Sequence, residues 1–333
     1  MRYAGIDLRA ALLRVLALAV AFAMALMWAA FVAEHAVYAT GTGTGAKNVL
    51  LIQTDHEFFY GYGTERDPGI IRENYSDFQS RAVSFPNAKS VCPLCSPARR
   101  SVLTGVYPHQ QGSDGLEQQL SWEQFRTYAA LTYAQTTMVD DAIGTILDTL
   151  EETGLADDTI VIWTNDHGDA LGSHGGHVDK DSYITEEVNA IAMAVYDPDL
   201  EEECGGTECD ALVNTLDVPV TMLGAYGLQF RNEEVTGMNM LDLIGNESLW
   251  RKYLVTEMNG HTNEVYTRVV YWKNYKYVYY FNDIDELYDL DADPYEMTNL
   301  IYEDSVSGVA DLLKSYLYEW QLETGDIVPL INL

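Results

Sequence analysis

The chain has 333 residues, enough for one large domain with a smaller appendage and a sizeable buried core. Its 51 acidic residues outnumber 19 basic residues, and the formal net charge is −32 at pH 7. Such a surface repels nucleic-acid phosphates, so the composition argues against nucleic acid as a partner and favours a soluble protein that attracts cations weakly.

The N-terminal segment combines basic residues with a long uncharged run. Arg2, Arg9 and Arg14 precede residues 15–33, which are rich in Ala, Leu, Val, Phe and Met. A helix of about twenty such residues crosses a bilayer, and the small residues near Val37-Tyr38-Ala39 suit a signal-peptide cleavage site. We therefore expect residues 1–39 to be a signal peptide or a membrane anchor. The rest of the chain is expected to be exported (periplasmic, cell-surface or secreted) or held by that anchor.

After a Gly/Thr linker at residues 40–47, two apolar runs each end in a possible metal ligand. The run at residues 48–54 leads to Asp55 and His56, and the run at residues 159–165 leads to Asp166 and His167. Both runs are typical of buried parallel strands, whose carboxyl ends carry the sites of open α/β sheets. The sequence therefore predicts that these side chains meet around a divalent cation.

Helical periodicity and aromatic content predict the secondary structure of three further segments. Apolar and small residues recur at helical spacing over residues 128–155, which predicts an amphipathic helix. Residues 268–279 are rich in Tyr and Val and are typical of edge strands of a small antiparallel sheet. A second amphipathic helix is expected over residues 306–320.

A cysteine motif lies between these two apolar runs. Residues 95–99 read Cys-Ser-Pro-Ala-Arg, which is Cys-x-Pro-x-Arg counted from Cys95, and the same count from Cys92 fails. Cys92 and Cys95 also form a Cys-x-x-Cys pair, so a thiol redox function stays open. A zinc site is disfavoured because Cys204 and Cys209 are too widely spaced for a second half-site.

On these residues the chain resembles the sulfatase family, whose signature is the Cys-x-Pro-x-Arg motif. Further matches are Asp-His-Gly at 166–168, Leu-Gly-x-His-Gly at 171–175, Glu-Leu-Tyr-Asp-Leu at 286–290 and Asp-Pro-x-Glu-x-x-Asn-Leu at 293–300. The resemblance implies an alkaline-phosphatase-like α/β fold, with a mainly parallel central sheet flanked by helices and a small C-terminal antiparallel sheet. It also implies a shortened catalytic domain at residues 48–245 and a C-terminal subdomain at residues 246–333.

The resemblance further implies a reaction. A formylglycine-generating enzyme, or an anaerobic sulfatase-maturating enzyme, oxidises the cysteine at position 95 to formylglycine. One hydroxyl of the hydrated aldehyde attacks sulfur, the alcohol leaves, and the second hydroxyl expels sulfate to restore the aldehyde. The implied substrate is a sulfated small molecule or glycan.

Site residues carried over by the resemblance fall into two groups. The metal ligands are Asp55, His56, Asp166 and His167, with Ca²⁺ as the expected ion and Mn²⁺ or Mg²⁺ as alternatives. The catalytic residues are Cys95, Arg99, Lys180, His109 and His174. Among them, Arg99 and Lys180 are expected to neutralise charge on the transferring sulfate.

One family segment is missing from the sequence. The family carries a Gly-Lys-Trp-His-type motif after the position of His109, and residues 110–127 contain nothing similar. We therefore expect weakened activity. A phosphonate or phosphate ester hydrolase of the same superfamily and a non-catalytic sulfatase-like protein remain alternatives.

Overall fold

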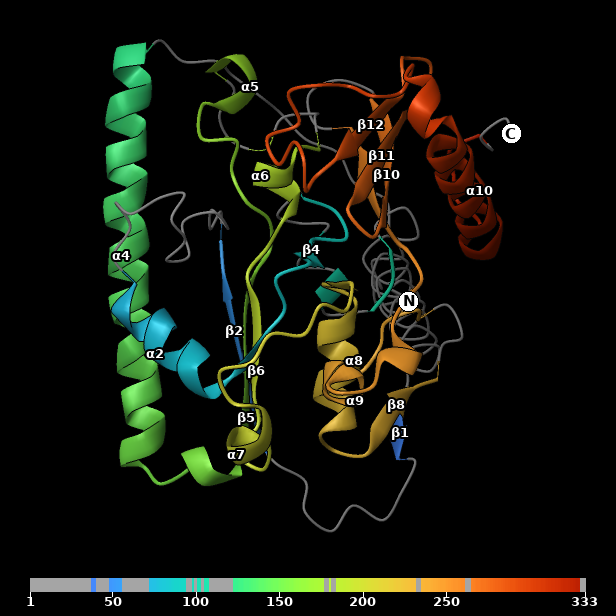
Figure 1. Ribbon diagram of the computed structural model, residues 1–333. Coiled ribbons are helices and arrows are strands. Elements are labelled where there is room, and N and C mark those ends of the chain that lie inside the picture. Colours follow the sequence, from blue (N-terminus) through green and yellow to red (C-terminus); the bar gives the residue numbers. More distant parts are fainter. Residues whose placement is uncertain are drawn as a thin grey trace, which may run out of the picture.

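The computed structural model describes residues 37–39, 48–55, 72–93, 98, 101–102, 105–107, 122–176, 180, 184–231, 235–260 and 265–329. Two four-stranded sheets stand side by side, with helices on the outer faces and between them (Figure 1). The apolar run at residues 15–33 lies outside the described residues. Within the described part of the chain, no helix is long and apolar enough to span a bilayer.

The central sheet has the strand order β2-β5-β6-β3. Its strands are β2 (Asn48–Thr54), β3 (Val83–Ser84), β5 (Thr159–Asn165) and β6 (Met193–Tyr196). β2 and β5 are parallel, whereas β6 runs antiparallel to both β5 and β3. The α/β class is therefore confirmed, but the described strands of this sheet are mixed. β6 is antiparallel because the chain that leaves the carboxyl end of β5 enters β6 at that same end of the sheet, where Thr164 pairs with Met193.

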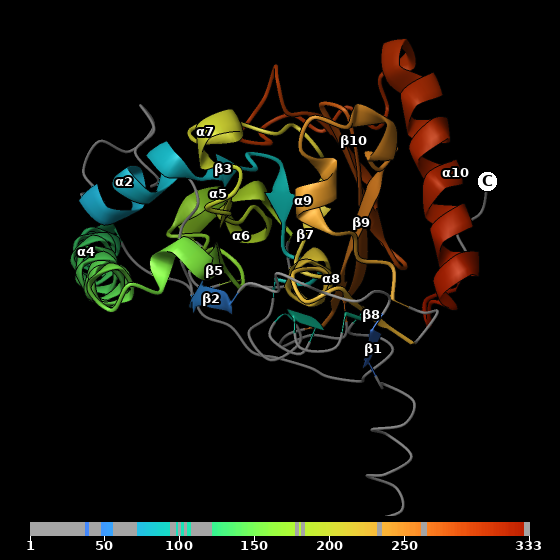
Figure 2. The same ribbon diagram turned by 90° about the horizontal axis from the view of Figure 1, so that it is seen from below.

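Helices cover both faces of the central sheet (Figure 2). α2 (Glu73–Arg81) and α4 (Trp122–Glu152) lie on one face, where Trp163 of β5 packs edge-on against Tyr75 of α2 at 4.9 Å. Asp140 of α4 accepts hydrogen bonds from the backbone amides of Asn74 and Tyr75, which joins the two helices. α8 (Asp217–Gly224) and α9 (Met240–Leu243) cover the other face. The helix expected at residues 128–155 is thus present, and it begins earlier.

The C-terminal sheet is fully antiparallel in the order β12-β11-β10-β9. Its strands are β9 (Leu254–Asn259), β10 (Tyr266–Trp272), β11 (Tyr275–Tyr280) and β12 (Glu286–Asp289), and α10 (Ser307–Thr324) packs on it. The expectation that residues 268–279 form edge strands was wrong, because β10 and β11 are the two inner strands. Arg268 and Lys276 of these strands are buried and ion-paired. In the sequence, charged residues in a strand indicate a solvent-exposed face, so their burial could not be predicted. The division at residue 245 stays a prediction.

Shorter elements fill the remaining described chain. Two small sheets pair β1 (Val37–Ala39) with β8 (Leu228–Phe230) and β4 (Ala88–Lys89) with β7 (Val213–Asn214). The short helices are α5 (Ser173–Gly176), α6 (Glu186–Asn189) and α7 (Glu201–Cys204), with 3-10 turns at Ala156–Asp158, Glu247–Leu249 and Asp304–Val306.

A buried network of charged side chains joins the C-terminal sheet to β4 and α6. Glu186 of α6 accepts a hydrogen bond from Lys89 of β4 at 2.5 Å and lies 3.5 Å from Lys276 of β11. Lys276 is also 2.5 Å from Glu296, whose other oxygen accepts the backbone amide of Glu186 at 2.7 Å. Burial opposes ionisation of Glu186, yet the two lysines lower its pKa to about 2. Every charge in this group therefore has an opposite partner.

We expect Lys276→Met to lower the free energy of unfolding by about 3–5 kcal/mol, because it leaves the carboxylates of Glu186 and Glu296 buried with one cation fewer. Urea unfolding followed by circular dichroism measures this. Lys273→Met is the matched control: Lys273 lies on the same hairpin but is exposed, and a change below about 0.5 kcal/mol is expected there. Equal losses in the two variants would contradict the assigned role of the network.

Candidate functional site

Adjacent parallel strands bring the first two candidate ligands together. Thr54 of β2 pairs with Asn165 of β5, so Asp55 and Asp166 are the next residues at the same sheet edge. Oxygen or nitrogen atoms of Asp55, Asp166 and His167 all lie within 4.8 Å of one another. Asp55 is exposed, whereas the other two are fully buried. The sheet therefore presents the trio at its carboxyl end, open to an incoming ligand on the Asp55 side.

Hydrogen bonds orient the imidazole of His167 for metal binding. Its Nδ1 lies 2.8 Å from the carbonyl oxygen of Gly168, which can only accept, so Nδ1 carries the proton. The lone pair is then on Nε2, which lies 3.6 Å from Oδ2 of Asp166. Two carboxylates and one correctly oriented imidazole fit a divalent cation, with carboxylate oxygens favouring Ca²⁺ or Mg²⁺ and the imidazole admitting Mn²⁺.

The turn that holds these ligands is fixed from behind by Asn165. Its side-chain amide donates to the carbonyl of His167 at 2.8 Å, and its side-chain oxygen accepts from the amide of Ala192 at 2.8 Å. A Cβ at Gly168 would clash with the backbone oxygen of Glu187, so this position requires glycine. The segment after β5 is therefore packed directly against the segment that leads into β6.

The segment that precedes the cysteine motif is anchored to the same turn. The hydroxyl of Ser90 lies 2.5 Å from the carbonyl oxygen of Asp166 and 2.9 Å from that of Cys92. The backbone amide of Val91 donates to Thr215 at 3.1 Å. Ser90, Val91 and Cys92 are all at most 1% exposed. The segment that precedes the cysteine motif is therefore buried and hydrogen-bonded beside the turn that carries Asp166 and His167.

Several predicted site residues lie outside the described part of the chain, and their positions are not assigned. These are His56, Cys95, Arg99 and His109. Ala98, inside the cysteine motif, is described and buried. Cys92 and Cys209 are buried, and Cys204 is partly exposed.

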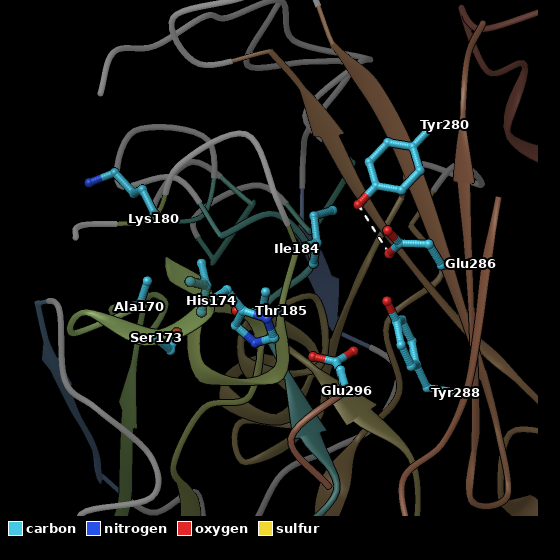
Figure 3. A pocket seen from close by; sticks show the side chains of 11 residues that line it. Ala170, Ser173, His174, Lys180, Ile184, Thr185, Tyr280, Glu286, Tyr288 and Glu296 are labelled. Carbon is cyan, nitrogen blue, oxygen red and sulfur yellow. Dashed lines mark hydrogen bonds between the residues drawn. The ribbon is translucent and has the colours of Figure 1, made fainter. Parts of the chain in front are cut away.

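Lys180 and His174 both line one cavity beside the segment that follows the ligand turn (Figure 3). His174 lies 3.5 Å from Glu187, and this hydrogen bond raises the pKa of His174 against the opposing effect of burial. Lys180 is 7% exposed. The imidazole of His174 therefore holds its proton to a higher pH than a free histidine.

Sequence reasoning missed Ser90, Asn165 and Glu187. For Asn165 a signal existed, since a polar residue that ends an apolar strand directly before a ligand is placed to brace the turn. Ser90 and Glu187 gave no such signal, because their partners are 76 residues and 13 residues away in the chain.

A family model for the C-terminal part of N-sulphoglucosamine sulphohydrolase matches residues 172–323. An N-acetylglucosamine-6-O-sulfatase of Bacteroides thetaiotaomicron is 28% identical over 219 residues, covering 63% of this chain and 38% of the relative. An arylsulfatase of Clostridium perfringens is 30% identical over 192 residues, covering 56% of this chain and 39% of the relative. The chain thus spans about two fifths of the length of these relatives.

Solved structures show the same fold. A 2-O GAG sulfatase superposes with a TM-score of 0.73 at 18% identity, covering 84% of this chain and 93% of that chain. A phosphonate monoester hydrolase of Agrobacterium radiobacter superposes with a TM-score of 0.71 at 14% identity, covering 84% and 96%. The chain is therefore similar in sequence to sulfatases, through the family model and these relatives, and the solved structures show that it has the alkaline-phosphatase-like fold.

Proposed function

We propose that this protein hydrolyses sulfate esters, using a formylglycine formed from Cys95 and a divalent cation bound by Asp55, Asp166 and His167. The observation that carries the proposal is the convergence of these three ligands on the turn to which Ser90 ties the cysteine segment. A bound cation supplies Lewis-acid polarisation of a sulfate oxygen. Hydrated formylglycine supplies the nucleophilic hydroxyl.

The chain's own residues then have separate tasks. Asp166 and His167 are held rigidly by the hydrogen bonds of the turn, so the cation site is formed before substrate binds. Lys180 and Arg99 neutralise charge on the transferring sulfate. His56 is a further ligand candidate beside Asp55, and His109 is a candidate for orienting the nucleophile or the sulfate.

A phosphonate or phosphate ester hydrolase is the second candidate function. The observation that favours it is His167 directly after Asp166, since the phosphonate hydrolase branch of the superfamily also suits an Asp-His pair there. A multifunctional alkaline phosphatase superfamily protein of Trinickia caryophylli is 28% identical over 232 residues. Rates on a sulfate monoester and a phosphonate monoester with the same alcohol decide between the two functions.

Removing one ligand should abolish tight metal binding. We expect Asp55→Ala to weaken the affinity for Ca²⁺ or Mn²⁺ by more than about 100-fold, because changes to outer-shell partners alone cost 10–100-fold. Isothermal titration of metal-free protein measures it. Asp158→Ala is the control, since Asp158 is an exposed carboxylate near the opposite end of β5. Unchanged affinity in Asp55→Ala would rule out the proposed ligand set.

The modification should occur at Cys95 and not at Cys92. When the full chain is co-expressed with a formylglycine-generating enzyme, we expect peptide mass spectrometry to find the aldehyde at position 95, because Pro97 and Arg99 complete the motif there. Cys92→Ser should still be modified, and Cys95→Ser should be inactive. An aldehyde at position 92, or an active protein with unmodified Cys95, would contradict the assignment.

Leaving-group chemistry should limit the rate. Because residues 110–127 lack the family's Lys and His pair, we expect an activated aryl sulfate to be hydrolysed and an unactivated alkyl sulfate to react about 10²–10⁴-fold more slowly. Steady-state kcat/KM on the two esters tests this.

Similar rates on both esters would reveal a substitute acid, and His174 is the described candidate. Its proton is lost as pH rises through the raised pKa, so rates on the alkyl ester should then fall at alkaline pH and in His174→Gln. No turnover by protein with confirmed aldehyde and metal would instead favour a non-catalytic protein.

A further inference from the structure

A second group of possible metal ligands shares no residue with the candidate cation site at the ends of β2 and β5. It consists of His174 of α5, Glu187 of α6 and Glu296 of the segment after β12. Ligand atoms of the three side chains all lie within 4.8 Å of one another, and Figure 3 shows the imidazole of His174 close to the carboxylate of Glu296. Both carboxylates are buried, whereas the histidine is exposed. Three distant parts of the chain therefore meet in one set of ligands.

One buried oxygen of this cluster has no well-formed hydrogen bond. Glu187 is only 6% exposed, and its Oε2 is buried without a hydrogen-bond partner. This oxygen lies 3.5 Å from Nε2 of His174, beyond the 2.7–3.2 Å of an ordinary N–H···O hydrogen bond. Buried polar atoms are paired in most proteins, so an orphan oxygen directed at an imidazole nitrogen indicates a ligand that fits between them.

Glu296 can accept a cation without leaving the buried network. Its Oε1 lies 2.5 Å from Nζ of Lys276, and its Oε2 accepts the backbone amide of Glu186 at 2.7 Å. A carboxylate has about four lone-pair sites on its two oxygens, so these two contacts leave about half of them open.

The cavity beside Lys180 gives the cluster room for water. It has a volume of about 220 Å³, and His174 and Glu296 line it. The hydroxyls of Ser173 and Thr185 in its wall are buried and have no hydrogen-bond partner. A water molecule occupies about 30 Å³ in the liquid, so the cavity can hold water that completes the coordination of an ion and hydrogen-bonds to these hydroxyls.

The charges around the cluster favour a cation. Among the described residues, the cluster, its salt bridges and the lining of the cavity contain four carboxylates and three lysines, namely Glu186, Glu187, Glu286 and Glu296 against Lys89, Lys180 and Lys276. Carboxylates thus exceed lysines by one, and His174 supplies a further positive charge only when it is protonated. With a neutral imidazole, the cluster therefore attracts a divalent ion.

We propose that His174, Glu187 and Glu296 form a second metal site, which takes Zn²⁺ with water from the cavity in the open position. Three protein ligands and an open position are typical of zinc sites of the catalytic type, and imidazole and carboxylate are both ligands of Zn²⁺. Ca²⁺ fits this set less well, because it takes 6–8 oxygen ligands. The ion joins α5 and α6 to the segment after β12, and the inference does not depend on the proposed function.

Zinc binding in the Asp55→Ala background tests the site separately from the first one. We expect this variant, stripped of metal, to bind about one equivalent of Zn²⁺ tightly in isothermal titration, and Asp55→Ala with Glu187→Gln to bind it more than about 100-fold more weakly. Asp55→Ala with Glu319→Gln is the matched control, because Glu319 is exposed on α10 and the charge change is the same.

Two results of this titration would refute the site. Equal weakening by Glu187→Gln and Glu319→Gln would assign zinc binding to the overall acidity of the protein. Unchanged binding in Glu187→Gln would place the ion elsewhere, for example on the cysteines. Circular dichroism of the variants shows whether each one is folded.

A crystal of the wild-type chain grown with Zn²⁺ locates the ion without any variant. Anomalous scattering at the zinc absorption edge should give a peak between His174, Glu187 and Glu296. A zinc peak elsewhere, with none at this cluster, overturns the inference. Such a result would leave the first cation site and sulfate ester hydrolysis untouched, since neither uses Glu187 or Glu296 as a ligand.

Discussion

The fold depends on the buried pairing of Lys89, Glu186, Lys276 and Glu296. Its members come from β4, α6, β11 and the segment after β12, so no single sheet contains it. Removing charges from water is costly, and the cost is offset only when all members meet in the correct geometry. The network therefore specifies how the C-terminal sheet is placed against β4 and α6. It does more for this placement than for net stability, since well-packed apolar residues could supply stability alone.

This placement has a direct effect on the candidate site. Lys89 immediately precedes Ser90, whose hydroxyl contacts the carbonyl of Asp166, and Glu186 immediately precedes Glu187, which contacts His174. The C-terminal sheet also supplies Glu286 to the cavity beside Lys180. The candidate metal ligands, the segment before the cysteine motif and the cavity therefore all lie next to residues of this network, although they belong to different parts of the chain.

Features that depend on neighbouring residues could be predicted from the sequence, whereas features that depend on partners far away in the chain could not. The strands ending at Asp55 and Asp166 were predictable, because an apolar run followed by a carboxylate is a local pattern and parallel strands align their ends. The inner position of β10 and β11 was not, since Arg268 and Lys276 suggested exposure until their partners Asp326 and Glu296 were known. The antiparallel direction of β6 could not be predicted either. The length of the connection between two strands does not determine whether the second strand starts at the same end of the sheet or at the opposite end.

The chain between β5 and β6 forms a loop that leaves and re-enters the central sheet at the same end. The segment between Thr164 and Met193 begins and ends on neighbouring strands, and the contact of Gly168 with Val188 closes its base. Lys180 and the cavity residue Ser173 lie between Gly168 and Val188, inside this closed loop, whereas the candidate cation ligands Asp55, Asp166 and His167 lie outside it. Exchanges between residues 169 and 185 can therefore remodel the cavity beside Lys180 without altering Asp166, His167 or the buried carboxylate of Glu186. A chimera confined to those residues would change the lining of the cavity and keep the buried network.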